Sequence, residues 1–371
     1  MASSMNTKRI KVLHVRSTIG MYGAEQVLLN ILPLLNEYCD AELLTLEAGI
    51  SESRTLRDLV GSCAVKNHHI VPEGRIDRLA MNEISNIIEN SRFNIIHCHD
   101  YKSLFYVRKI ARQLGLPVIH HIHGALGNTV LEKIYGCIEK YMMRKVSRIF
   151  TVSMEQKNSL ENSMLTYPKI KQVANGTVVQ PISNQKIFDT KELKLIMVAR
   201  FTEEKNHSMA LDLIAELKIK GTPVTLTLLG DGPLKNDIQE TINSKSLNDE
   251  VKLVGFTRDV QAWLDQSDVL LITSKTEGMP MNMLEGMVGG LPVISTTVGE
   301  IPRLIKESKC GETFVSLEEL IELVIKVTRN KPAWKKRGLS GRAYVEDNLS
   351  VDQQVKSLDA EYRKVLGFYD N

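Results

Sequence analysis

The sequence predicts an α/β protein in which two doubly wound parallel sheets follow one another along the chain. Short apolar, β-branched runs alternate with helical patterns in two series, and the turn-rich stretch 173–185 separates them. The chain of 371 residues is also longer than one hydrophobic core usually serves. Because continuous apolar strands interleaved with helices are typical of parallel sheets covered on both faces, we expect two such domains.

The elements follow in order. Between the first two strands, residues 22–36 carry the broad apolar stripe of a helix. Beyond about residue 316 only helical patterns remain. We expect a first domain at 1–185, a second at 186–350, and a helical segment at 351–371 that packs back on the first. The expected strands are 9–15, 41–46, 94–99, 117–123 and 148–153, then 193–199, 224–230, 251–256, 268–274 and 291–296.

Composition narrows the class of protein. The net charge of +3 is too small to suggest nucleic-acid binding. The five cysteines show no CxxC spacing, which fits reduced thiols better than a disulfide framework or a zinc ribbon. The amino-terminal residues lack the apolar core of a signal peptide, and no stretch approaches the roughly 18 apolar residues of a membrane span. We therefore expect a cytoplasmic protein.

The charge is unevenly distributed. Residues 1–185 hold 22 Lys and Arg against 16 Asp and Glu, a net +6, whereas the remainder holds 25 against 28, a net −3. Ordinary scatter explains this as well as a domain that meets an anionic lipid surface or an acidic acceptor does.

Polar residues collect where strands of the second series end, which is where parallel sheets bind ligands. Arg200 follows the strand at 193–199, and Lys205 stands just before a helix start. Together they would clamp a diphosphate, unless Arg200 pairs with Glu203 or Glu204 instead. The next strand ends in the turn Gly230–Pro233, where glycine backbone comes close to a ligand or simply turns.

The run TSKTEGMPMNMLEGMVGGLPVIS places two carboxylates, Glu277 and Glu285, eight residues apart. We expect Glu277 in the loop after a strand and Glu285 on the following helix, with Pro280 in its first turn. The amides of Met281 and Asn282 at the helix start would then point at an anion. The alternative is that Glu285 is a buried acid satisfied by backbone amides.

These motifs resemble those of the family 4 glycosyltransferases, also called glycosyltransferase group 1. The resemblance covers nearly the whole chain and is most specific at EGMPMNMLEGMVGGLPVI, which matches the family's E-x7-E signature. It implies the GT-B fold, which has two Rossmann-like domains and an active site in the interdomain cleft. It also implies a retaining reaction that uses a nucleotide-sugar donor.

The resemblance also implies residue roles. Arg200 and Lys205 would hold the donor diphosphate, Glu285 the ribose hydroxyls, and Glu277 would reach the transferred sugar. The catalytic residues implied are Glu277, His123, Arg200 and Lys205. The donor-binding residues implied are Gly23, Arg200, Lys205, Gly230, Phe256, Glu277, Met281, Asn282 and Glu285.

The first domain carries two weaker matches and the second carries two departures. STIGMYGAEQV resembles the family's glycine loop, with Tyr22 and Gly23 at the usual paired glycines and Gly23 left as the amide donor. HHIHG matches the strand-end histidine at His123. Gly286 stands where alanine is common, which changes helix packing. Glu300 and Arg303 depart from the usual glycine and glutamate.

Five of the nine histidines fall at two strand ends, so a metal site is conceivable because alternate strand residues share a face. Only Asp100 supplies a nearby carboxylate, and we expect core contacts plus one sugar-facing ring at His123 instead. The histidines concerned are His97, His99, His120, His121 and His123.

The resemblance implies a hexosyltransferase that moves a sugar, most often from a UDP-sugar, to a glycan or lipid-linked acceptor in surface polysaccharide or lipopolysaccharide assembly. We expect no cofactor and no metal, because fixed positive groups can stabilise the leaving diphosphate and no Asp-x-Asp is present. If the basic charge of the first domain is more than scatter, peripheral contact with the inner face of the membrane is the partner it indicates. The alternatives are a UDP-sugar 2-epimerase of the same fold and a non-catalytic nucleotide-sugar-binding protein.

Overall fold

A computed structural model describes residues 9–18, 23–47, 56–74, 76–123, 130–163, 165–181, 188, 190–257 and 259–368. Within these ranges the side chains of 57–59 and 130–133 are not described. The chain forms two compact units. Unit 1 joins the part up to Gly176 to the segment from Val351 onward, and unit 2 runs from Thr177 to Ser350. The sequence places the boundary at 185 instead, and residues 182–187 lie outside the described ranges.

Unit 1 is built on one sheet of seven strands in the order β3-β2-β1-β4-β5-β6-β7. All six neighbouring pairs are parallel. The strands are β1 (Lys11–Thr18), β2 (Asp40–Glu47), β3 (Asn67–Ile70), β4 (Ile95–Cys98), β5 (Val118–Ile122), β6 (Arg148–Thr151) and β7 (Ile170–Gln172).

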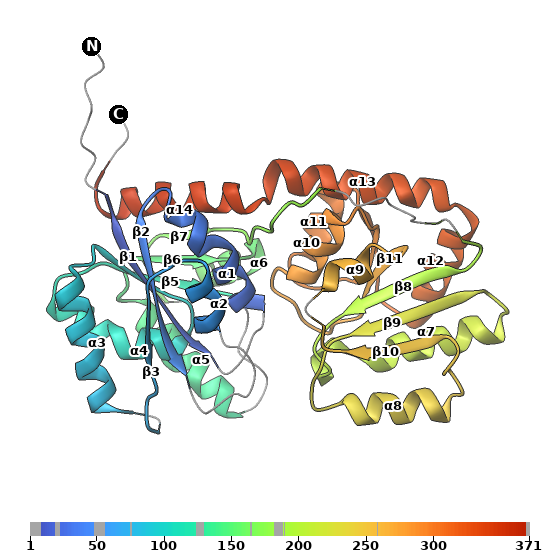
Figure 1. The fold of residues 1–371 in the computed structure, drawn as a ribbon, viewed down its shortest axis with the longest axis horizontal. Coiled ribbons are helices and arrows are strands. Elements are labelled where there is room, and N and C mark those ends of the chain that lie inside the picture. The colour runs from blue at the N-terminus through green and yellow to red at the C-terminus, as the bar shows by residue number, and fades with distance from the viewer. Residues whose placement is uncertain are drawn as a thin grey trace, which may run out of the picture. The chain divides into compact units, whose positions relative to one another are not determined.

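Helices cover both faces of this sheet and bury its central strands. Every residue of β4 and of β6 is buried, as is nearly all of β2. The C-terminal helix α14 returns to unit 1 and packs against α1 (Figure 1). The helices are α1 (Gly23–Leu35), α2 (Leu56–Ser62), α3 (Arg78–Ser91), α4 (Tyr101–Gln113), α5 (Val130–Met143), α6 (Met154–Glu161) and α14 (Val351–Val365).

Unit 2 has a parallel sheet of six strands in the order β10-β9-β8-β11-β12-β13. Its strands are β8 (Leu193–Val198), β9 (Val224–Leu229), β10 (Val251–Gly255), β11 (Val269–Ile272), β12 (Val293–Thr296) and β13 (Gly311–Phe314). Its helices are the 3-10 turn η1 (Glu203–Lys205), α7 (His207–Ile219), α8 (Lys235–Ser244), α9 (Val260–Leu264), α10 (Met281–Val288), α11 (Ile301–Ser308), α12 (Leu317–Arg329) and α13 (Lys331–Asn348).

The strand order reverses once in each sheet. In unit 1, β1 lies between β2 and β4, and in unit 2, β8 lies between β9 and β11. The loops after β8 and β11 therefore leave neighbouring strands at the reversal point, which is where doubly wound sheets form a crevice for ligands. Those two loops carry Lys205 and Glu277.

All ten expected strands are present within a few residues of their predicted bounds. Three strands were missed, namely β3, β7 and β13, and each lies at an edge of its sheet. The prediction for Pro280 was wrong by one position: Pro280 has extended backbone and is the N-cap of α10, outside the first turn.

Two glycines after β9 allow the backbones of two loops to meet. Gly230 has φ +142°, and a Cβ there would lie 1.9 Å from the carbonyl oxygen of Ala199. Gly232 has φ +159°, and its Cβ would lie 2.6 Å from the carbonyl oxygen of Phe201. Side chains would thus push apart the loops after β8 and β9.

We predict that Gly230→Ala lowers the free energy of unfolding of unit 2 by about 3 kcal/mol or more, because it combines backbone strain with a backbone clash. Gly221→Ala is the matched control, since Gly221 has φ +64° but no atom within 4 Å of the position that a Cβ would take. That control should lose only about 1–2 kcal/mol. Both tryptophans, Trp263 and Trp334, belong to unit 2, so fluorescence during urea unfolding reports it. Equal losses would contradict the packing argument.

Candidate functional site

Lys205 and Glu277 form an ion pair where β8 and β11 end. Nζ of Lys205 lies 2.6 Å from Oε1 of Glu277, and Oγ of Ser274 donates to the same oxygen at 2.6 Å. Only 8% of the Glu277 side chain and 20% of the Lys205 side chain are exposed. Because the pair is partly shielded from water, its attraction is stronger than that of a surface pair. The carboxylate is therefore held in one place by a cation and a hydroxyl.

The two loops are also joined through backbone. Oγ1 of Thr273 donates to the carbonyl oxygens of Lys205 and Asn206, both at 3.0 Å. The amide of Glu300 donates to the carbonyl of Gly278 at 3.0 Å. A Cβ on Gly299, which has φ +56°, would lie 2.2 Å from the carbonyl oxygen of Glu277. The loop carrying Glu277 is thus supported from both sides.

The start of α10 is fixed by Asn282. Its Nδ2 donates to the carbonyl of Val198 at 2.7 Å, and its Oδ1 accepts from the amide of Met283 at 2.8 Å. The N-cap residue Pro280 makes no side-chain hydrogen bond to the described residues of this helix. Because the first amides of a helix point outward with a partial positive charge, the amides of Met281 and Asn282 are suited to an anion. The side chain of Met281 is buried, so only its backbone is placed for that role.

Glu285 lies further along α10 and is half-buried. Burial raises the pKa of its carboxyl from 4.5 to about 7. Among the described residues its side chain has no hydrogen-bond or ion-pair partner, which leaves the expectation of satisfaction by backbone amides without support. At Gly286 a Cβ would lie 2.7 Å from Cδ2 of Leu270, so glycine lets α10 approach β11 closely.

Three further candidates lie around these loops in unit 2. Arg200 is exposed directly after β8, and its charge contributes to lowering the pKa of Glu204. Phe256 is 68% exposed at the end of β10. The amide of Gly230 donates to the carbonyl of Gly255 at 2.9 Å, so this N–H is used within the fold.

The remaining candidates, Gly23 and His123, belong to unit 1. Gly23 is exposed as the first residue of α1, whereas residues 19–22 of the expected glycine loop, Tyr22 included, and Gly124 of HHIHG lie outside the described ranges. His123 directly follows β5 and is half-buried. Its Nε2 lies 2.9 Å from Nδ1 of His99.

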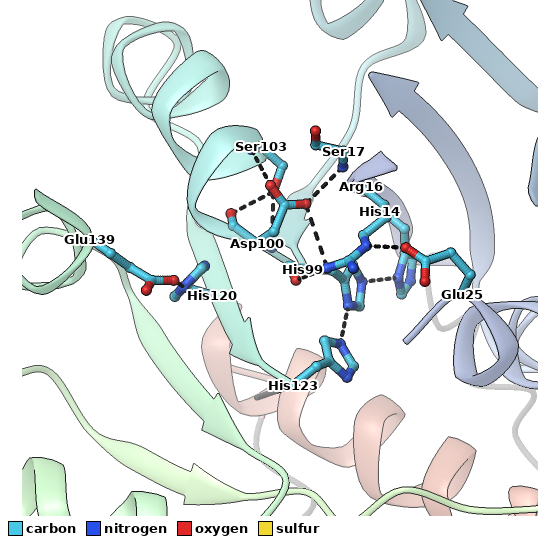
Figure 2. A network of polar contacts seen from close by, with 10 residues as sticks. All are labelled: His14, Arg16, Ser17, Glu25, His99, Asp100, Ser103, His120, His123 and Glu139. Carbon is cyan, nitrogen blue, oxygen red and sulfur yellow. Dashed lines mark hydrogen bonds and ion pairs between the residues drawn. The ribbon is translucent and has the colours of Figure 1, made fainter. Parts of the chain in front are cut away.

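His123 belongs to a cluster of five imidazole rings on neighbouring strands. His14 and His97 are register partners on β1 and β4. Ring centroids of His97 and His99 lie 4.2 Å apart, and those of His121 and His123 lie 4.3 Å apart. Figure 2 shows His99 between His14 and His123, joined to each of them by a dashed line.

Burial keeps these rings neutral. It lowers the pKa of His14 and His121 to about 3, and it holds the pKa values of His97, His99 and His123 well below 6.5, with the neighbouring rings adding to the effect. Neutral imidazoles can donate one hydrogen bond and accept another.

A charged group that sequence reasoning missed lies beside the rings. Nε of Arg16 donates to the fully buried Glu25 at 2.7 Å, and its NH1 donates to the carbonyl of His99 at 2.7 Å (Figure 2). Asp100 accepts from the amides of Ser17 and Ser103 and so joins the end of β1 to the start of α4. The one available signal was Glu25, an acid inside the apolar stripe of α1.

Comparison with known proteins decides the family. Residues 179–343 match the family described as Glycosyl transferases group 1, and residues 21–180 match the one described as Glycosyltransferase Family 4. The chain belongs to the family 4, group 1 glycosyltransferases. It is therefore an enzyme that transfers sugars, which favours transfer over the epimerase and over the non-catalytic binding protein.

The relatives of this glycosyltransferase are distant but extend over most of it. An Escherichia coli protein named UDP-Gal:alpha-D-GlcNAc-diphosphoundecaprenol alpha-1,3-galactosyltransferase is 25% identical over 350 residues, which cover 87% of this chain and 89% of that protein. The putative glycosyltransferase EpsF of Bacillus subtilis is 25% identical over 320 residues, covering 80% and 82%.

Solved structures establish the fold of the glycosyltransferase as GT-B. Anabaena Alr3699/HepE, solved in complex with UDP-glucose, superposes with a TM-score of 0.83 at 15% identity and covers 97% of this chain and 100% of its own. The lipopolysaccharide outer core galactosyltransferase WaaB superposes with a TM-score of 0.74 at 16% identity, covering 97% and 100%.

No helix among the described residues is both long and apolar enough to span a membrane. The described cysteines are all free thiols, as the sequence predicts.

We predict that acid destabilises unit 1 steeply. Each buried ring has a lower pKa folded than unfolded, so the unfolded chain binds more protons below pH 6.5 and stability falls as pH falls through that value. For five rings that stay neutral, the limiting slope below about pH 5.5 is roughly 5–7 kcal/mol per pH unit.

Hydrogen exchange of β4 and β5 by mass spectrometry, corrected for intrinsic rates, measures this slope. His121→Gln removes one titrating ring and should reduce the slope by about one proton, or roughly 1.4 kcal/mol per pH unit. Protection of β4 and β5 that stayed constant from pH 7 to pH 5 would contradict the expectation.

Proposed function

We propose that this glycosyltransferase transfers a hexose from a UDP-sugar to a glycan or lipid-linked acceptor, with retention of configuration, in the assembly of cell-surface polysaccharide or lipopolysaccharide. The observation that carries the proposal is the shielded Lys205–Glu277 pair at the strand reversal of unit 2, in the loop that leads into α10. The names of the Escherichia coli relative and of the HepE complex, which contain UDP-Gal and UDP-glucose, support the choice of donor.

Arg200 and Lys205 are assigned to the donor diphosphate. Negative charge develops on this group as the sugar departs, and fixed positive groups stabilise it most where water is partly excluded. Lys205 is held in place by Glu277. The backbone amides of Met281 and Asn282 add the partial charge of the helix start. These groups supply the neutralisation in the proposal, so transfer should persist in the presence of a chelator.

The remaining residues are assigned to parts of the donor and the acceptor by their places in the two units. Glu285 is assigned to the ribose hydroxyls, since its carboxylate has no partner among the described residues and can accept two of them. Backbone near Phe256 is assigned to the base, and Gly230 to the turn that lets backbone approach the donor. Glu277 is assigned to the hydroxyls of the transferred hexose, and in unit 1 His123 and Gly23 are assigned to the sugar and the acceptor side. Retention is assigned to front-face attack assisted by the leaving phosphate.

A membrane surface is proposed for unit 1. Ile134, Ile138 and Tyr141 of α5 are 51%, 41% and 55% exposed at spacings of four and three residues, so they share one helix face. The exposed cations Lys140, Arg144 and Lys145 lie beside this face in the sequence. An apolar stripe bordered by cations is typical of helices that lie in the headgroup region of anionic bilayers.

We predict that Lys205→Gln lowers kcat/KM for the UDP-sugar by about 100-fold or more, because it removes a positive charge that stabilises the negative charge developing on the diphosphate. Lys275→Gln is the matched control, since Lys275 also forms an ion pair, with Glu203, but is half exposed. Release of UDP in the presence of acceptor measures both variants. Equal activity of the two variants would remove Lys205 from the site.

We predict that UDP binding releases a proton from Glu285 near pH 7. Ribose hydroxyls donate to the ionised carboxylate, so binding lowers a pKa that burial has raised to about 7. Affinity should therefore rise with pH through that value. Calorimetry in buffers of different ionisation enthalpy measures the proton count.

Comparing proton release by the unaltered protein and by Glu285→Gln assigns the released proton to Glu285, because UDP and the cations titrate alike in both proteins. The variant should bind UDP about tenfold more weakly, corresponding to a lost charged hydrogen bond, and should release fewer protons. Identical proton release by the two proteins would assign Glu285 to packing instead.

We predict that the protein sediments with anionic vesicles and much less with zwitterionic ones. The double variant Ile134→Glu/Ile138→Glu should abolish sedimentation, whereas Ile219→Glu, on the 80% exposed Ile219 of unit 2, should not. Binding that survives the double variant would place the contact elsewhere.

A further inference from the structure

A series of hydrogen-bonded contacts, referred to below as the line, links the hydroxyl of Tyr362 on α14 through His14 and His99 to His123. Nε2 of His123 lies 2.9 Å from Nδ1 of His99, and Nε2 of His99 lies 2.9 Å from Nδ1 of His14 (Figure 2). Nε2 of His14 lies 3.4 Å from the hydroxyl of Tyr362, which is itself 2.7 Å from Nδ1 of His97. His14, His97, His99 and Tyr362 are all buried.

The spacing of these nitrogens fits shared protons better than a shared metal ion. Both trios His14–His97–His99 and His99–His121–His123 have ligand atoms within 4.8 Å of one another, which is close enough to consider a metal. Two nitrogens bound to one tetrahedral zinc lie about 3.3 Å apart, since each bond is about 2.0–2.1 Å. The two linked pairs here are 2.9 Å apart, the length of a hydrogen bond.

All hydrogen bonds in such a line are donated in the same direction. Each neutral imidazole carries one N–H and one lone pair, so a ring that accepts at one nitrogen must donate at the other. Fixing the proton at one end therefore fixes it along the whole line. Because burial disfavours the charged form of every ring in it, an additional proton that would break this rule is excluded.

The hydroxyl of Tyr362 sets the direction. Its short 2.7 Å distance to Nδ1 of His97 is typical of O–H donation, whereas the 3.4 Å distance to His14 fits a weaker N–H donor. The oxygen then accepts from Nε2 of His14. Next, Nδ1 of His14 accepts from His99, and Nδ1 of His99 accepts from Nε2 of His123.

One nitrogen remains unused at each end. Nδ1 of His123 is buried and has no hydrogen-bond partner among the described residues. In this direction it carries a lone pair. Nε2 of His97 also has no hydrogen-bond partner among the described residues, and the ring meets Phe150 at 86° with centroids 5.5 Å apart.

We propose that Tyr362, His14 and His99 are positioning residues that hold His123 as the Nε2–H tautomer, so that Nδ1 presents a lone pair to a hydroxyl group of the sugar substrates. The hydroxyl as recipient rests on the proposed function. The tautomer does not, since it follows from the contacts within unit 1.

Nuclear magnetic resonance of the protein with ring-15N histidine tests the tautomer directly. We expect His123 protonated at Nε2, with 15N–15N coupling across the bonds to His99 and His14. A proton on Nδ1 of His123, or absent coupling, would overturn the proposal. Zinc chloride at micromolar concentration should leave the ring signals unchanged, and stoichiometric shifts of His14, His97 and His99 would assign the cluster to a metal instead.

Variants separate positioning from packing. Tyr362→Phe keeps the buried ring and removes the hydroxyl, and it should give mixed tautomers at His123 and lower kcat/KM by about three- to tenfold, the effect of one hydrogen bond. Tyr106→Phe is the matched control, because Tyr106 is also buried in unit 1 and its hydroxyl accepts from the amide of Asp77 rather than contacting a histidine among the described residues. It should change neither quantity.

A second pair of variants tests the line if Tyr362→Phe fails to fold. His14→Asn keeps an acceptor oxygen where Nδ1 stood and should retain the His123 tautomer, whereas His14→Leu should lose it. Equal spectra for the two would overturn the proposal. If the tautomer is as expected but no UDP-sugar is turned over by the unaltered protein, the proposed function fails and the line of histidines stands.

Discussion

The parallel alignment of every described strand within its sheet is the constraint on which the rest of the structure depends. It requires a crossover connection between consecutive strands, and the helices of these connections cover both faces of each sheet and bury the central strands. It also gathers the strand ends at one edge. Polar side chains such as Lys205 and Glu277 meet there, because that is where the backbone leaves the sheet.

Central strands could be predicted from the sequence because continuous apolar runs are uncommon outside a covered sheet. The three missed strands, NHHI, IKQ and GETF, lie at sheet edges, where one side of the backbone lacks a neighbour and the side chains are polar or partly exposed. Their pairing is decided by β2, β6 and β12 beside them. A sequence of three or four residues contains no signal for this pairing with a neighbouring strand.

The candidate site was predictable where its residues stand in one segment. Glu277, Met281, Asn282 and Glu285 occur within nine positions, and strand, loop and helix signals place them in order. Contacts between distant segments were not predictable: Lys205 pairs with a residue 72 positions away, and Tyr362 meets His97 across 265. The raised pKa of Glu285 likewise depends on what surrounds the helix rather than on its sequence.

The return of α14 to unit 1 has a consequence for the order in which the protein can be made. Unit 2 is a continuous segment, but unit 1 is divided by it. During synthesis the amino-terminal sheet must wait, through the whole of unit 2, for Tyr362 to cover the histidines and for Glu361 to pair with the buried Arg148. Until then, β1 and β4 expose polar rings that only the finished chain encloses. The second unit can therefore be folded while the first is still an intermediate. Surface exposed in such intermediates is what chaperones bind.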